Sequence, residues 1–287
     1  MRATQPAILV IGEFLDHRQF IPFVNKHLSE FANVQFGCIN PIADNRLAGQ
    51  LIRRRTFERD FSRLINAYDC LITCSQKRWL KNCKDIADKN ELLNFELTFE
   101  QADNYRWRLW DEPKEEAPSK QTLSLTIRNF NPLPSKYSAS QWIDACERET
   151  RRVERLLEYC HELVQLLTLC EPERLPFDAL KTQLLGQKEF RMGIGTASGP
   201  SRAITAASKA IKQSGCDGQA GVLVAAVYGA NVSQREKDDI RHQLAKLRQS
   251  KATPLHVLFK ENFQLSNALK VALFAAGPEM AGMGTVI

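Results

Sequence analysis

Short apolar runs alternate with amphipathic stretches through the first third of the chain. Three continuous apolar segments are bounded by polar or turn residues, which predicts buried strands at residues 7–12 (AILVIG), 33–39 (NVQFGCI) and 69–74 (DCLITC). Between the first two, apolar side chains such as Phe20 and Val24 recur at three- and four-residue steps, the spacing of an amphipathic helix. Strands that alternate with helices predict a parallel, doubly wound α/β sheet.

The middle of the chain changes from strand-like alternation to one long helical pattern. Residues 91–99 (ELLNFELTF) and 121–128 predict further strands, and residues 111–120 (DEPKEEAPSK) predict a charged surface loop. From residue 140 to residue 170 no glycine or proline interrupts an apolar pattern with three- and four-residue steps. A rise of about 1.5 Å per residue makes this a helix of about 45 Å.

A second set of strands and helices is predicted beyond residue 200. Residues 222–228, 254–259 and 268–276 are typical of strands, and Ser233 with Glu236 has the pattern of a capping box. His256 lies inside an apolar strand, so we expect it to be a structural residue and not a ligand. One apolar helix face is predicted from Ala203, Ile204, Ala207, Ala210 and Ile211. We divide the chain into residues 1–138, 139–171 and 172–287.

Three glycines, Gly193, Gly195 and Gly199, precede that helix and allow two interpretations. In a phosphate loop, their backbone N–H groups and the helix N-terminus would approach an anion. The spacing matches neither G-x-G-x-x-G nor G-x-x-x-x-G-K-[ST], because the third glycine is one position late and no lysine follows it. We favour the second interpretation, a strand that turns tightly into a helix and binds nothing.

Residues 192–203 (MGIGTASGPSRA) resemble the segment that opens the C-terminal subdomain of FtsZ, a member of the FtsZ/tubulin superfamily. The resemblance continues through residues 221–224 (GVLV) and ends near residues 276–277, in the family's order and at similar spacing. It implies a tubulin/FtsZ-like α/β fold. That fold has a degenerate doubly wound N-terminal subdomain, a long central helix and a C-terminal α+β subdomain with a small sheet. The three glycines then mark the turn at the entry to the C-terminal subdomain.

The N-terminal half lacks the glycines with which such proteins hold GTP. Only three of the 14 glycines, at positions 12, 37 and 49, precede Gly186. The family's glycine-rich turns correspond here to GEFLDHRQF and CSQKRWLKN, in which Glu13 and Asp16 would repel phosphate. Lys77 and Arg78 are the weak anion candidates, and through them weak nucleotide binding stays open. The resemblance therefore implies that GTP binding is not retained, and we expect no bound cofactor.

Residues 174–181 (RLPFDALK) resemble the family loop that completes GTP hydrolysis in the neighbouring subunit. The family pattern Asn-x-Asp-x-x-Asp polarises the attacking water, and its three places hold Arg174, Pro176 and Ala179 here. Asp178 is one position out of register, and a displaced carboxylate positions a water poorly. We expect no catalytic residue here and predict an interface loop of Arg174, Pro176, Phe177, Asp178 and Lys181.

Composition narrows the class of protein. Lys and Arg outnumber Asp and Glu by 39 to 33, and a formal charge of +6 is a small excess for a nucleic-acid-binding protein. Cysteines such as Cys38, Cys70, Cys160 and Cys216 lie in apolar runs, and none of the eight forms a C-x-x-C pair, which predicts reduced thiols and no metal site. Without a signal peptide or a membrane segment, we expect a cytoplasmic protein.

Three functions remain open on these grounds. The leading hypothesis is an FtsZ-like protein without GTPase activity that acts through protein–protein or filament-type contacts, in cell division or another cytoskeletal assembly. Its partner would be an FtsZ-like subunit, a second copy or an unrelated assembly component. The alternative is a divergent, self-assembling GTPase that uses Lys77, Arg78 and Asp178. A weaker alternative is a nucleic-acid adaptor that uses the triplet at residues 53–55 (RRR).

Overall fold

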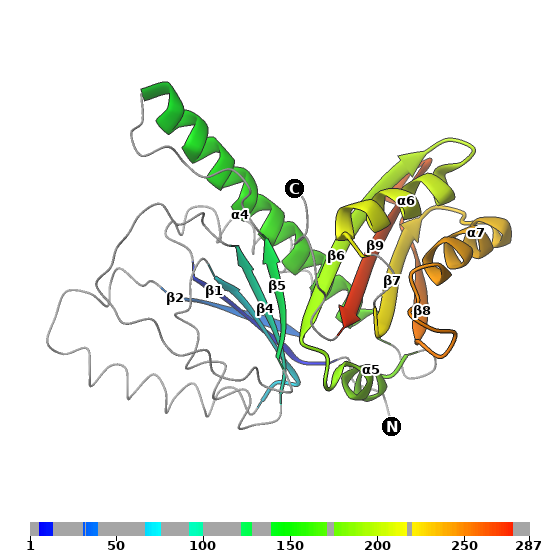
Figure 1. The fold of residues 1–287 in the computed structure, drawn as a ribbon, viewed down its shortest axis with the longest axis horizontal. Coiled ribbons are helices and arrows are strands. Elements are labelled where there is room, and N and C mark those ends of the chain that lie inside the picture. Colours follow the sequence, from blue (N-terminus) through cyan, green and yellow to red (C-terminus); the bar gives the residue numbers. More distant parts are fainter. Residues whose placement is uncertain are drawn as a thin grey trace, which may run out of the picture. The chain divides into compact units, whose positions relative to one another are not determined.

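The chain folds into two compact units. A computed structural model describes residues 6–13, 31, 33–39, 67–75, 92–99, 122–127, 139–170, 175–216 and 220–277. The N-terminal unit comprises Ala7–Thr122 and Thr126–His161, and the C-terminal unit comprises Met1–Pro6, Leu123–Leu125 and Glu162–Ile287. Each unit has its own strands, so the two are described in turn (Figure 1).

The N-terminal unit contains the predicted parallel sheet. Its strands lie in the order β2-β1-β3-β4, every neighbouring pair is parallel, and their bounds are β1 Ile8–Glu13, β2 Val34–Ile39, β3 Cys70–Ser75 and β4 Leu93–Phe99. Apolar side chains such as Ile8, Leu71 and Phe95 are fully buried, as the continuous apolar runs predict for a sheet covered on both faces. The strand order reverses at β1, which confirms the doubly wound pattern.

Helix α4, Ala139–Thr168, confirms the predicted central helix. Leu156, Cys160, Leu163 and Leu167 are buried at steps of four, three and four residues, so one stripe of the helix is apolar. The strand predicted at residues 121–128 is also confirmed as β5, Thr122–Ile127, whose Ser124 pairs in parallel with Glu189 in the C-terminal unit.

The C-terminal unit is built on a mixed sheet in the order β6-β9-β7-β8. Strand β9 runs antiparallel to both neighbours and β8 runs parallel to β7. The strands are β6 Glu189–Ser198, β7 Val222–Gly229, β8 Leu255–Glu261 and β9 Ala268–Gly277. The helices are α5 Phe177–Leu184, α6 Arg202–Ser214, α7 Gln234–Ala245 and the short 3₁₀ helix η3 Phe263–Leu265, with α6 and α7 on one face of the sheet (Figure 1).

Alternate side chains of this sheet enter two different cores. Odd-numbered residues such as Val227 of β7 and Val271 of β9 pack with Ala206 of α6 and Ile240 of α7. Even-numbered residues face the other way, where Ala226, Tyr228 and Ala272 form a smaller cluster with Leu169 and Leu265. The alternation follows from the period of two along a strand. It covers the sheet on both faces.

The structure confirms the predicted strand that turns into a helix, but the assignment of Gly193 and Gly195 to the turn is wrong, because both lie in the strand. Both lie in β6 and face α6, where a Cβ on Gly193 would come 2.6 Å from the amide nitrogen of Ser214. Helix backbone therefore fills the space that an anion would need above these glycines. Only Gly199, with φ of 88°, lies in the turn before α6, a backbone conformation that glycine adopts readily.

Helix α6 reaches β6 closely because its inner face is made of small side chains. Ala203, Ala206, Ala207 and Ala210 are buried. Ile204, which was predicted for this apolar face, is 39% exposed, so its assignment is wrong. The short distance between α6 and β6 requires glycine in the strand. The same short distance favours alanine over larger residues on the helix.

Candidate protein interface

The predicted interface loop is the start of helix α5. Leu175 is buried and Pro176 is exposed before the helix, but Phe177, Asp178 and Lys181 lie inside it, so the loop assignment is wrong for these three. Arg174 lies outside the described residues. Asp178 is in the first turn, where a carboxylate interacts favourably with the helix dipole. The segment is therefore a regular helix start.

One face of α5 is open to solvent. Asp178 and Thr182 are exposed four residues apart, as is Leu185, the residue that directly follows the helix, while Leu180 and Leu184 on the opposite face are buried. Leu185 is 43% exposed, which is high for a large apolar side chain. We call Pro176, Asp178, Thr182 and Leu185 the α5 face. It combines a carboxylate, a hydroxyl and apolar surface, a composition suited to contact with another protein.

A histidine fixes α5 to the sheet. His256 Nε2 lies 2.8 Å from Oε1 of Gln183, which joins the start of β8 to α5. Burial lowers the pKa of His256, so the imidazole is neutral near pH 7 and donates this hydrogen bond. The structural role predicted for His256 is confirmed.

Arg202 joins three segments at the other end of these strands. Its Nε donates to Oε1 of Glu236 at 2.7 Å, and its Nη1 and Nη2 atoms donate to the carbonyl oxygens of Asn267 at 3.1 Å and Ala230 at 3.3 Å. Glu236 also closes the capping box with Ser233, as predicted. The guanidinium of Arg202 holds the pKa of the Glu236 carboxyl well below its usual range, at about 2. Arg202 lies in the segment that resembles FtsZ, and Glu236 lies in the predicted capping box. Nothing in the sequence indicates that the two residues pair.

Glu236→Gln is expected to lower the free energy of unfolding by about 1 to 2 kcal/mol at pH 7, through loss of the ion pair and part of the cap. A lowered folded-state pKa means that this stability is full above the ordinary pKa of 4.5 and is lost as the pH falls toward about 2. Urea denaturation at a series of pH values from 7 to 2.5 measures the difference in free energy of unfolding between Glu236→Gln and the unchanged protein. This gap should close below pH 4.5. Asp239→Asn removes the same charge from α7 as a control. A gap that is constant with pH would contradict the assignment.

The other predicted site residues are only partly placed. Glu13 ends β1 at the carboxyl edge of the parallel sheet, in register with Ile39 of β2 and Ser75 of β3. Ligands of doubly wound sheets bind at this edge. Lys77 and Arg78, Asp16 and the triplet at residues 53–55 lie outside the described residues. The structure therefore brings no second charged candidate next to Glu13 in the part it describes.

Neither a metal cluster nor a membrane-spanning helix occurs among the described residues. No group of three or more His, Cys, Asp or Glu side chains there is arranged to hold a metal ion. In the same residues, no helix is both long enough and apolar enough to cross a bilayer. Cys70, Cys74 and Cys160 are buried as reduced thiols.

Comparisons with known proteins identify the fold. No family model and none of the curated proteins matches the chain. Among solved structures, an empty FtsZ dimer from M. jannaschii matches with a TM-score of 0.66 at 16% identity, over 96% of this chain and 89% of that one. TubZ protofilaments in the GDP form from Bacillus thuringiensis serovar israelensis match with a TM-score of 0.57 at 10% identity, over 96% and 88%. A GTPγS-bound protofilament of CetZ2 from Haloferax volcanii matches with a TM-score of 0.57 at 11% identity, over 96% of this chain and 94% of that one. The chain therefore has an FtsZ/tubulin-like fold, as the resemblance implied.

Proposed function

We propose that this chain is an FtsZ-like protein that acts through filament-type contacts with other proteins and does not hydrolyse GTP. The observation that carries the proposal is the α5 face. It begins in the segment that resembles the family's hydrolysis loop, yet it presents a single carboxylate, Asp178, and, beyond that segment, an exposed apolar side chain, Leu185. Such a surface can bind a neighbouring subunit without acting on a nucleotide.

The shared fold supports assembly as the activity. Two of the similar structures are protofilaments, and a third is a dimer. In this chain α5 is held rigidly, since Leu180 and Leu184 are buried and Gln183 is bonded to His256. A preorganised helix face loses little conformational entropy when a partner binds. The α5 face is therefore the contact surface that we propose.

The absence of hydrolysis is supported by the residues of two segments, the end of β1 and the start of α5. Glu13 is at the carboxyl edge of the central strand β1, where a carboxylate opposes a bound phosphate. Pro176 and Ala179 stand where the family pattern has carboxylates that position the attacking water, and Ala179 is inside α5. Water positioning depends on geometry, so one displaced carboxylate is a poor replacement.

Sedimentation and phosphate release from the same samples test both halves of the proposal. We expect the chain to sediment, either alone and to the same extent with and without GTP, or together with purified FtsZ. In the samples without FtsZ, we expect the chain to release no phosphate above a buffer blank. FtsZ alone is the positive control for turnover. Phosphate release that rises with the concentration of the chain would overturn the second half in favour of the GTPase alternative. Failure to sediment under any of these conditions would overturn the first half.

Leu185→Glu tests whether the α5 face is the contact. We expect the concentration needed for sedimentation to rise at least tenfold, about 1.4 kcal/mol, because a charge replaces an apolar contact. Ile204→Glu is the matched control. Ile204 is an apolar residue of helix α6 that is 39% exposed, close to the 43% exposure of Leu185. Equal effects of the two substitutions would contradict the assignment of the α5 face.

A further inference from the structure

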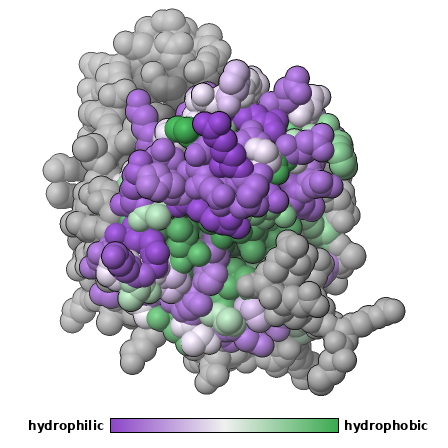
Figure 2. All heavy atoms as spheres, turned by 90° about the vertical axis from the view of Figure 1, so that its right-hand side faces the viewer, coloured by the Kyte–Doolittle hydropathy of each residue, from purple (hydrophilic) through white to green (hydrophobic). Residues whose placement is uncertain are grey.

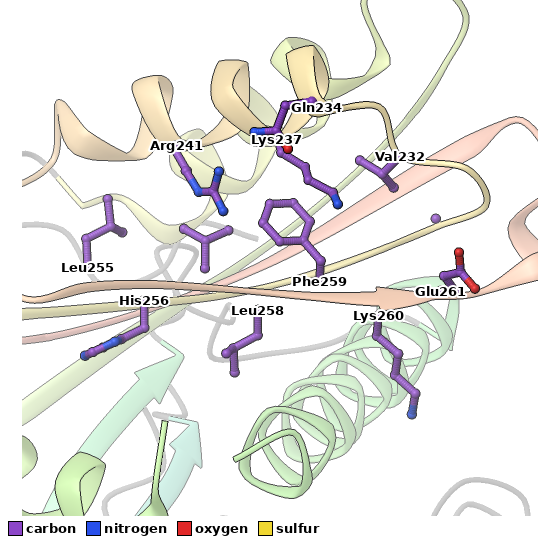
Figure 3. Close-up of a pocket in the computed structure, with 12 residues that line it drawn as sticks. Val232, Gln234, Lys237, Arg241, Leu255, His256, Leu258, Phe259, Lys260 and Glu261 are labelled. Atoms are coloured by element: carbon purple, nitrogen blue, oxygen red, sulfur yellow. The ribbon is translucent and has the colours of Figure 1, made fainter. Parts of the chain in front are cut away.

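A groove of about 630 Å³ runs between helix α7 and strand β8, and no residue of the α5 face lines it. Its floor is apolar, formed by Leu255, Val257 and Phe259, which alternate along β8 and extend the larger core. Figure 3 shows Leu255 and Phe259 pointing toward α7, from which Lys237 and Arg241 reach back over the strand. The groove is therefore an apolar strip beneath two cations.

The backbone of β8 is open along this groove. Among the described residues β8 pairs with β7 alone and ends the sheet. The amide of Leu223 donates to the carbonyl oxygen of Pro254 at 3.0 Å, and the amide of Asn262 donates to that of Gly229 at 3.3 Å, so even-numbered residues of β8 bond to β7. The N–H and C=O groups of residues 255, 257, 259 and 261 consequently point outward. A row of such groups is a template for another strand.

The charges beside the open edge are mainly positive. Lys237 Nζ lies 5.4 Å and the guanidinium carbon of Arg241 lies 5.3 Å from the centroid of the Phe259 ring. Asp238 contacts Arg241 at 3.1 Å, but both side chains are about half exposed, so this pair leaves Arg241 available. The groove lining contains three cations and one carboxylate, Glu261. Figure 2, which faces this side, shows hydrophobic surface beside a broad hydrophilic region.

We propose that β8 binds an extended acidic segment of a partner protein by strand addition. The partner's backbone bonds to the outward N–H and C=O groups of β8, and carboxylates at alternate positions of the added strand meet Lys237 and Arg241. Apolar side chains elsewhere on the same face of the added strand cover the strip of Leu255, Val257 and Phe259. Main-chain bonds supply the affinity, and the two cations select acidic segments. The inference does not depend on the proposed assembly through the α5 face.

Selection from a display library of 12-residue peptides with the full chain as bait tests the proposal. We expect the selected peptides to carry Asp or Glu at alternate positions and to lack proline. A fluorescein-labelled copy of the strongest peptide is then titrated by fluorescence anisotropy. The double substitution Lys237→Ala with Arg241→Ala is expected to weaken its binding at least tenfold. Arg235→Ala, an exposed position on the same helix outside the groove, is the matched control and should change binding less than twofold.

Two changes test strand addition itself. Val257→Pro removes an outward N–H and no bond to β7, a position where an edge strand tolerates proline, and should weaken the peptide at least tenfold. If this variant fails to fold by circular dichroism, the same peptide with N-methyl groups at alternate residues gives the equivalent test on the unchanged protein. Leu185→Glu should leave peptide binding unaltered, which separates this site from the α5 face.

Three results would overturn the proposal. One is a library that yields no acidic enrichment. Another is a selected peptide that binds equally well to Val257→Pro, or equally well after N-methylation. The third is self-association of the chain that the peptide inhibits and that Val257→Pro abolishes. A second copy of the chain would then be the occupant of β8.

Discussion

Gly195→Ala is expected to destabilise the C-terminal unit by about 3 kcal/mol, near the upper end for overpacking a close contact. A Cβ at this position would lie 2.7 Å from the amide nitrogen of Ala210 and 2.9 Å from Cβ of Lys209, and it would also meet the carbonyl oxygen of Ala206. Two of these three atoms are helix backbone, so relief requires α6 to move off the sheet. Denaturation by urea, followed by circular dichroism, measures the loss. Hydrogen exchange of the α6 amides shows where it occurs.

Gly199→Ala is the matched control for that substitution. Gly199 has no heavy atom within 4 Å of an added Cβ, but its φ of 88° is strained for alanine. We therefore expect a loss of about 1 kcal/mol, with α6 exchange unchanged. If Gly195→Ala costs no more than Gly199→Ala, the close packing of α6 on β6 is not the reason for glycine in this strand.

Much of the fold follows from local patterns in the sequence. The apolar runs that became β1, β2 and β3 are short, continuous and bounded by polar residues, so burial of both sheet faces dictates their composition. Helix α4 was equally predictable, because an uninterrupted three- and four-residue repeat over 30 residues fits one helix. Where side-chain pattern alone determines the element, prediction succeeded.

Prediction failed where a distant segment determines the local structure. Gly193 and Gly195 suggest a turn by composition, but they are required in a strand because α6 packs on their Cα atoms. The contact of Arg202 with Glu236 spans 34 residues, and that of Lys270 with Glu162 spans 108, so neither is visible in local spacing. The groove at β8 was missed for the same reason, since its walls come from two elements whose pairing only the fold establishes.

Lys270→Met is expected to lower the free energy of unfolding of the C-terminal unit by about 3 kcal/mol. Lys270 Nζ lies 2.6 Å from Oε1 of Glu162, and the two side chains are only 20% and 4% exposed. The same ammonium lies 4.7 Å from the centroid of the Tyr228 ring. Methionine keeps the packing on that ring but removes the Lys270 ammonium from the buried Glu162 carboxylate. The measurement is denaturation by urea, with Arg241→Met, at the exposed pair with Asp238, as a control expected to cost about 0.5 kcal/mol or less.

Adding Glu162→Gln to Lys270→Met should restore most of that loss, because removal of both charges eliminates the desolvation penalty that the single substitution exposes. The double-mutant cycle should then give a coupling energy well above 1 kcal/mol between α4 and β9. Burial and the charge of Glu162 both raise the pKa of Tyr228, so the phenol stays protonated and neutral throughout the measurement. Additive losses would mean that solvent already screens the Lys270–Glu162 pair.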